Sequence, residues 1–92
     1  MALLTDTELL DALSGLPGWH VRAGALEKDY RGEDFMWAVG FVNRIAERAE
    51  AAGHHPDLSL GWGTVTVRLV THSENGITRA DTDLAATIDG VA

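Results

Sequence analysis

The strongest constraint on the fold is the turn Gly53-His54-His55-Pro56 near the middle of the chain, because it has to end a helix. Gly53 has no Cβ and readily takes the left-handed conformation that closes helices. Pro56 lacks an amide hydrogen and favours an extended conformation at His55. The preceding segment, about Glu33 to Ala52, has apolar side chains at helical spacing and an acidic start that suits the helix dipole. The two histidines are therefore predicted to lie on a stiff bend after a long helix.

Strand-like segments lie on both sides of that helix. After the bend, apolar and polar residues alternate over Asp57–Trp62 and Thr64–His72, and Gly61-Trp62-Gly63 permits a hairpin reversal. Before the helix, Trp19–Ala23 and Ala25–Tyr30 predict two more strands. Because these segments carry one apolar and one polar face, we expect an antiparallel sheet that is covered on one side only.

Two shorter helices complete the pattern. One opens at Thr5 or Asp6, and Thr5 has capping-box spacing to Glu8; the other is capped by Thr78. The side chains expected to face the core are Leu9, Leu10 and Leu13 in the first helix and Leu84, Ala85 and Ile88 in the last. The order α-β-β-α-β-β-α predicts an α+β two-layer sandwich, a four-stranded antiparallel sheet with three helices on one face, as a single domain over residues 1–92.

One apolar stripe of the long helix is predicted to face the core. Its members are Phe35, Val39, Val42, Ile45, Ala46 and Ala49. Trp37 and Phe41 do not lie on this stripe, and helical geometry places Trp37 roughly opposite it. Because another surface usually covers a Trp in such a place, we expect a subunit contact there. The alternative is a Trp37 ring that lies over the stems of Arg44 and Arg48.

Composition narrows the classes of partner. Fourteen acidic residues against seven basic ones give a formal charge of −7, which disfavours nucleic acid. Without cysteine, the chain has no disulfide framework or thiolate nucleophile. No apolar run approaches the roughly 18 residues of a membrane span, and the start Met1-Ala-Leu-Leu lacks the basic flank of a signal peptide. We expect a cytoplasmic protein that binds neither nucleic acid nor membrane.

Candidate chemistry centres on three histidines, His54, His55 and His72, because imidazole both gives and takes protons near neutral pH. His20, the fourth, is expected to be a polar position on a half-buried strand. Glu50 and Asp81 lie where they can meet the three histidines if the hairpin folds back over the helix end. Two imidazoles on opposite sides of one small molecule suit general acid–base catalysis of an elimination, such as a dehydration.

Plainer interpretations of the same residues remain open. A His-His-Pro turn is often only a surface bend, and Asp81 has the spacing to bond a backbone amide at the start of the helix that Thr78 caps. A zinc site made from His54, His55 and His72 is a further alternative, although neighbouring residues of an extended segment point to opposite sides.

The motif Glu50-x-x-x-His54-His55-Pro56, followed by Trp62, His72 and Asp81 after five, nine and eight intervening residues, resembles the signature of the pterin-4a-carbinolamine dehydratase family. Agreement at so many fixed offsets makes the resemblance specific. Weaker similarity extends back through Leu16-Pro17-Gly18-Trp19 and Tyr30–Phe41, so that most of the chain is covered.

The resemblance implies an α+β sandwich that dehydrates 4a-hydroxytetrahydropterins to quinonoid dihydropterins, in the recycling of tetrahydrobiopterin, without a metal or organic cofactor. It implies a homodimer or homotetramer. In its terms His54 and His72 form the acid–base pair acting at the 4a-hydroxyl and at N5–H, and His55 binds and orients the pterin. Glu50 and Asp81 are supporting carboxylates, and Pro56 and Trp62 belong to the same substrate site.

The chain departs from the family pattern at the strands after the bend. Leu58 stands where the family often has an aromatic residue, and Leu60-Gly61-Trp62-Gly63 replaces an Asn-Val-Tyr-Asn-like hairpin. Relatives of the family also act as dimerisation cofactors or assembly factors. A non-enzymatic binding module on the same fold is therefore the alternative to a dehydratase, and the three histidines are the feature that favours the enzyme.

Overall fold

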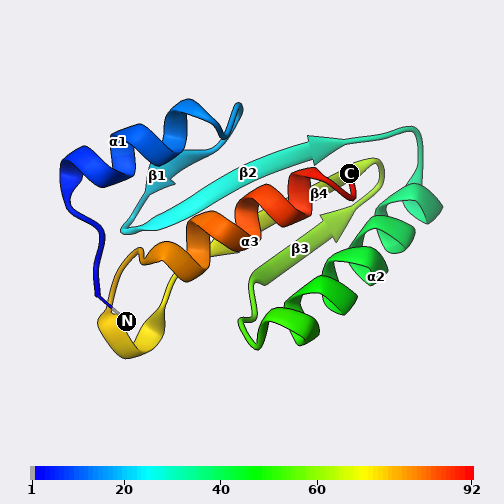
Figure 1. Ribbon diagram of the computed structural model, residues 1–92. Helices are drawn as coiled ribbons and strands as arrows, with labels where there is room; N and C mark the ends of the chain where they lie inside the picture. Colours follow the sequence, from blue (N-terminus) through cyan, green and yellow to red (C-terminus); the bar gives the residue numbers. More distant parts are fainter. Residues whose placement is uncertain (1) are drawn as a thin grey trace.

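Three helices and four strands follow one another along the chain in the predicted α-β-β-α-β-β-α order. The computed structural model describes residues 2–92, so Met1 of the predicted domain lies outside the described part. The elements are α1 (Asp6–Ser14), β1 (His20–Arg22), β2 (Ala25–Arg31), α2 (Phe35–Ala52), β3 (Asp57–Gly61), β4 (Thr64–Leu69), a 3-10 turn η1 (His72–Glu74) and α3 (Arg79–Asp89) (Figure 1). Over residues 2–92, no helix has the length and apolar character needed to cross a membrane.

The sheet is antiparallel throughout, with the strand order β1-β2-β4-β3. Ala23 and Gly24, at φ 48° and 77°, make the tight turn between β1 and β2, and positive φ at both positions is what such a hairpin needs. Along β4 the apolar residues are fully buried and the polar ones half-buried, alternating as Thr64-Val65-Thr66-Val67-Arg68-Leu69. The helices therefore cover one face of the sheet and leave the other open, as predicted.

Capping residues set the helix boundaries as their chemistry predicts. Thr5 and Glu8 form a reciprocal capping box at the start of α1. Asp34 accepts a hydrogen bond from the Trp37 amide, so α2 begins at Phe35 rather than at Glu33. Gly53 closes α2 in the left-handed conformation, with φ 63°, which requires no Cβ to clash.

The predicted core face of α2 is wrong by part of a turn. The buried residues are Ala38, Phe41, Ile45 and Ala49, whereas Phe35 is 48% exposed. Phe41, predicted to lie off the stripe, is fully buried and its ring packs edge-on against Tyr30 at 4.7 Å. The first half of α2 is apolar nearly all round, so periodicity there does not define one face, and packing against α3, β3 and β4 decides which residues are buried.

Trp37 is half-buried by its own chain. Its ring lies 5.6 Å from that of Phe41. It also fills the space beside Gly32 so closely that a Cβ on that glycine would come within 2.0 Å of the ring. Arg44 stands over Phe41, at 5.6 Å, rather than over Trp37. Intramolecular packing thus covers part of the Trp37 ring, and the subunit contact at Trp37 stays a prediction.

Three further predictions need correction. Leu10 is 70% exposed while Leu9 and Leu13 pack against the core. The first strand begins at His20, and Trp19 before it lies in the core. The last strand ends at Leu69, not at His72. Its neighbour β2 pairs with it only as far as Leu26, which lies opposite Leu69, and the chain before Ala25 turns away. His20 is an exposed polar position on β1, as predicted, but all three residues of this strand are exposed, so the strand is not half-buried.

The C-terminal end of α3 is anchored to β2 through Asp89. Its Oδ1 accepts hydrogen bonds from Trp19 Nε1 at 3.1 Å, from Lys28 Nζ at 2.9 Å and from the Tyr30 hydroxyl. Burial, and then the bond to Asp89, raise the pKa of Tyr30 well above its ordinary value. A negative charge at a helix C-terminus interacts unfavourably with the helix dipole. The three hydrogen bonds to Asp89 offset this unfavourable interaction.

Replacing Phe41 with Ala is expected to lower the free energy of unfolding by about 3–5 kcal/mol, because it leaves a cavity in the core. Phe35→Ala on the same helix is the matched control, since Phe35 is half exposed, and its cost should stay below about 1 kcal/mol. Urea denaturation followed by circular dichroism measures both. Equal losses in the two variants would contradict the assignment of Phe41 to the core and Phe35 to the surface.

Candidate active site

The bend after α2 sends its two histidines in different directions. The His54 amide still donates to the Ala49 carbonyl at 3.2 Å, which completes the last turn of α2. Pro56 then leads straight into β3. The His54 side chain reaches α3, where it meets Asp81, while the His55 side chain turns back to Glu50 on α2. The two carboxylates singled out in the sequence are therefore each paired with one histidine.

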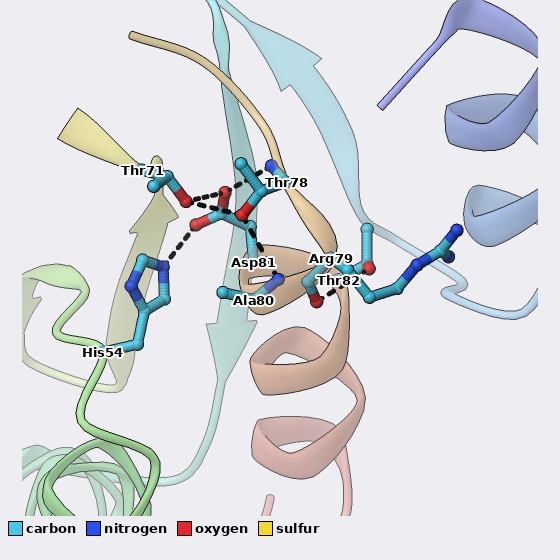
Figure 2. Close-up of polar contacts among 7 residues, drawn as sticks. All are labelled: His54, Thr71, Thr78, Arg79, Ala80, Asp81 and Thr82. Atoms are coloured by element: carbon cyan, nitrogen blue, oxygen red, sulfur yellow. Dashed lines mark hydrogen bonds and ion pairs between the residues drawn. The ribbon is translucent and has the colours of Figure 1, made fainter. Parts of the chain in front are cut away.

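Asp81 is the buried polar centre of this region. It is fully buried, and its Oδ1 lies 2.5 Å from His54 Nε2. Its Oδ2 accepts from the Thr78 amide and from the Thr71 hydroxyl, both at 2.8 Å. Figure 2 shows these contacts converging on the carboxylate from α3, from the end of α2 and from the segment after β4. Asp81 thus has both predicted roles: it caps α3 and it binds a histidine.

His55 and Glu50 form an ion pair at the surface. His55 Nε2 contacts Glu50 Oε2, and both side chains are more than 60% exposed. An exposed pair of this kind is screened by water and contributes little to stability. The imidazole of His55 is consequently free to exchange Glu50 for another partner, in contrast to His54, whose side chain is only 17% exposed.

His72 lies just beyond the sheet, in the 3-10 turn η1, and its side chain is exposed. Thr71 connects it to the buried centre. The Thr71 hydroxyl bonds Asp81, and its backbone is held by a bridge to Gly76. Thr71 therefore belongs to the network that holds His54 and is the direct neighbour of His72 in the chain. The described residues provide the His72 imidazole with no hydrogen-bond partner.

Trp62 is not brought to the histidines within this chain. It lies at the tip of the β3–β4 hairpin and is 74% exposed. The five residues of β3 separate it from Pro56, and a strand of that length spans about 16 Å. Leu58, one of the departures from the family pattern, is half-buried and packs against the core from β3.

The open face of the sheet carries a shallow hollow of about 180 Å³. Its lining residues are Glu27, Asp57, Leu58, Ser59, Thr66 and Arg68. It begins two residues after His55, yet the three histidines do not line it. Arg68 is already engaged there by Glu27 and by the backbone carbonyls of Arg22 and Ala23. Across residues 2–92, no three His, Asp or Glu side chains group as a metal site requires.

Two threonines belong to the site that the sequence pattern did not assign to it. Thr78 was recognised only as a helix cap, and Thr71 only as part of a strand. Both hydroxyls meet at 2.8 Å, beside Asp81. The signal for Thr71 was present: it directly precedes His72, and a hydroxyl there can reach a carboxylate at the start of the next helix.

Comparisons with known proteins identify the family of the chain. The model of the family described as pterin 4 alpha carbinolamine dehydratase matches residues 2–91. The chain belongs to this family. A relative from Mycobacterium avium is 46% identical over 91 residues, covering 99% of this chain and 97% of its own. One from Mycobacteroides abscessus is 49% identical over 89 residues, covering 97% and 95%. Both are provisionally named pterin-4-alpha-carbinolamine dehydratases.

Two solved structures share the fold of the chain. A protein from Brucella melitensis described as a transcriptional coactivator/pterin dehydratase superposes with a TM-score of 0.93, at 36% identity, over 98% of both chains. A pterin dehydratase-like protein described as a RuBisCO assembly factor of the alpha-carboxysome gives a TM-score of 0.67 at 21% identity, over 80% of this chain and 86% of its own. The second likeness shows the fold alone.

Asp81→Ala is expected to destabilise this pterin-4a-carbinolamine dehydratase family member by about 3–5 kcal/mol, because it leaves buried donors without their charged acceptor. Asp83→Ala is the control on the same helix, since Asp83 is exposed, and its effect should stay within about 0.5 kcal/mol. Thermal and urea unfolding report the difference. A similar, small effect at both positions would contradict the structural role of Asp81.

Proposed function

We propose that the protein is a dehydratase that converts a 4a-hydroxytetrahydropterin to a quinonoid dihydropterin. The observation that carries the proposal is the contact between His54 and the buried Asp81 carboxylate, at positions that match the family motif. A carboxylate behind an imidazole orients the ring and stabilises the imidazolium that forms when the ring takes a proton. Family membership supports the same activity.

The reaction consists of two proton transfers around one bond rearrangement. A base takes the proton from N5, the N5 electron pair forms the C4a=N5 double bond, and the C4a–O bond breaks. An acid protonates the departing hydroxyl, which leaves as water. The substrate loses only the elements of water, so one base and one acid are enough to complete the step. General acid–base catalysis of this kind typically raises the reaction rate by roughly 10²–10⁴-fold.

In this proposal the catalytic residues are His54 and His72, acting at N5–H and at the 4a-hydroxyl. His55 is exposed and paired only with Glu50, which suits a residue that binds and orients the pterin by exchanging partners. Pro56 holds the bend that presents both neighbouring imidazoles. Glu50 and Asp81 support the histidines that they contact.

The setting of this activity follows from the same reasoning. A dehydratase of this kind serves the recycling of tetrahydrobiopterin, and we place it in the cytoplasm. A formal charge of −7 disfavours a nucleic-acid partner, and the substrate is a small molecule. No organic cofactor or metal takes part in the proposed step.

A non-enzymatic assembly or dimerisation factor is the second candidate. The related Brucella melitensis structure is described as a coactivator as well as a pterin dehydratase. The exposed apolar side chains at one end of the molecule, described below, are the feature that favours it. A scaffold, however, has no physical need for an imidazole against a buried carboxylate.

His54→Ala and His72→Ala are each expected to lower kcat for dehydration of a 4a-hydroxytetrahydropterin by roughly 10²–10⁴-fold, with the fold intact by circular dichroism. His20→Ala is the matched control, because His20 is an exposed histidine on β1 outside the site. Stopped-flow absorbance measures the rate against buffer. A wild-type rate no faster than buffer would favour the assembly factor and reject the dehydratase.

We further propose that the protein is a homodimer or homotetramer. Four large apolar side chains, Phe35, Met36, Leu60 and Trp62, are 40–74% exposed at the start of α2 and along the β3–β4 hairpin. The Gly32 amide, which donates to the Gly63 carbonyl at 3.0 Å, ties these two segments together. Large exposed apolar side chains on two segments that are joined in this way favour a protein–protein interface there.

Met36→Glu is therefore expected to shift the protein from an oligomer towards a monomer in sedimentation velocity experiments. Leu10→Glu is the control, since Leu10 is equally exposed but lies on α1. A monomeric wild-type protein at micromolar concentration would contradict the proposal, as would an equal response of both variants.

A further inference from the structure

In the hydrogen bonds around Asp81, the chemistry of the groups determines which one donates and which one accepts. A threonine hydroxyl carries one hydrogen, and that of Thr71 is donated to Asp81 Oδ2 at 2.8 Å. The 2.8 Å contact between the two threonine hydroxyls must then use the hydrogen of Thr78. Thr78 Oγ1 in turn accepts from the Ala80 amide at 3.2 Å. The order of donors is Thr78 to Thr71 to Asp81 (Figure 2).

The same logic fixes the hydrogen of His54. The Asp81 carboxylate only accepts hydrogen bonds, so the 2.5 Å contact with His54 Nε2 requires a hydrogen on that nitrogen. The neutral ring therefore carries its hydrogen on Nε2, and Nδ1 keeps an unshared electron pair. Every buried side-chain nitrogen or oxygen of the described residues has a hydrogen-bond partner, and Nδ1 has none. This nitrogen is consequently reached by solvent.

Thr71 is well placed to hold this arrangement. Its amide donates to the Gly76 carbonyl at 2.9 Å and its carbonyl accepts from the Gly76 amide at 3.3 Å, so its backbone is fixed on both sides. Its hydroxyl is the only side-chain donor to Oδ2 among residues 2–92. Thr71 also directly precedes His72. The same residue therefore orients Asp81 and fixes the backbone position from which the second catalytic histidine extends.

We propose that Thr71 is a positioning residue: its hydroxyl orients Asp81, which holds His54 as the Nε2–H tautomer with Nδ1 as the proton acceptor. The assignment deepens the proposed dehydratase function, on which its kinetic part rests. His54 Nδ1 takes the proton from N5, and the imidazolium that results stays bound to Asp81. His72, which enters the step as an imidazolium, delivers its own proton to the departing hydroxyl, which leaves as water. His54 then loses a proton to solvent and His72 regains one, so that both return to their starting forms.

The tautomer is tested on the free protein by ¹⁵N NMR of labelled histidines, at a pH where imidazole is neutral. The wild type is expected to show His54 with a protonated Nε2 and a bare Nδ1. In Asp81→Asn, the Thr71 hydroxyl and the Thr78 amide retain the amide oxygen, so the NH₂ faces His54 and the tautomer should reverse. A wild-type ring protonated on Nδ1, or an unchanged tautomer in Asp81→Asn, would overturn the proposal.

The role of Thr71 itself is tested with one variant that keeps its shape and one that keeps its hydroxyl. Thr71→Val removes the hydroxyl and should replace the single His54 tautomer by a mixture, while Thr71→Ser keeps the hydroxyl and should restore the single form. The signals of His20 serve as the internal control. A pure wild-type pattern in Thr71→Val would show that Asp81 needs no help from the hydroxyl, and would reject the assignment.

Kinetics separate this proposal from the proposed function. Thr71→Val should lower kcat at least about tenfold with little change in KM, and Thr71→Ser should recover most of it. An equal loss in both variants would mean a packing role and reject the positioning role. If the wild type has no dehydratase activity, the proposed function fails, while the NMR measurement still decides whether Thr71 fixes the tautomer of His54.

Discussion

The structure depends on one buried carboxylate. Asp81 receives hydrogen bonds from the first turn of its own helix, from the segment that leaves β4 and from the histidine that ends α2. The histidine lies 27 residues before Asp81, whereas Thr71 and Thr78 are close to it in sequence and also bond each other. A buried charge without such donors would strongly destabilise the fold, so the geometry of all three segments is tied to the position of this one side chain.

The two ends of α3 are held by the same device. At the start of α3, Asp81 accepts hydrogen bonds from three directions. At its end, Asp89 accepts hydrogen bonds from Trp19, Lys28 and Tyr30. A domain of 92 residues buries a modest core, and this one has no cysteine with which to build a disulfide. Specific polar anchors at both ends of a helix fix its rotation and its register over the sheet in a way that apolar contacts alone do not.

Local chemistry made most of the fold predictable from the sequence. Thr5, Gly53 and Thr78 act through groups within a few residues of themselves, so their roles as caps could be predicted without knowledge of the rest of the chain. Phe41 and Leu69 depend on other elements: packing on the sheet and on α3 determines which side of α2 is buried, and β2 determines where β4 stops pairing. Sequence periodicity carries no information about these contacts.

The candidate site was likewise predictable in part. Its residue types and spacing were visible in the sequence, as was the choice of Asp81 between a cap and a histidine partner, but the sequence offered these as alternatives. In the structure one carboxylate does both, because its two oxygens point to different segments. The hairpin at Gly61-Trp62-Gly63 was predicted, but the separation of Trp62 from the histidines was not, because the spacing of a motif does not show that β3 extends between its two parts.

This division of Asp81 between two tasks bears on function. Capping α3 needs only the reciprocal contacts between Thr78 and Asp81, which are complete without His54. The buried His54–Asp81 pair carries a desolvation cost, which apolar side chains in place of both partners would avoid at similar stability. Stability therefore gives no reason for His54 to be there, whereas proton transfer does, because a carboxylate that orients an imidazole and stabilises its charged form is what a general base requires. The shared fold does not distinguish an enzyme from an assembly factor, but this pairing does favour the enzyme.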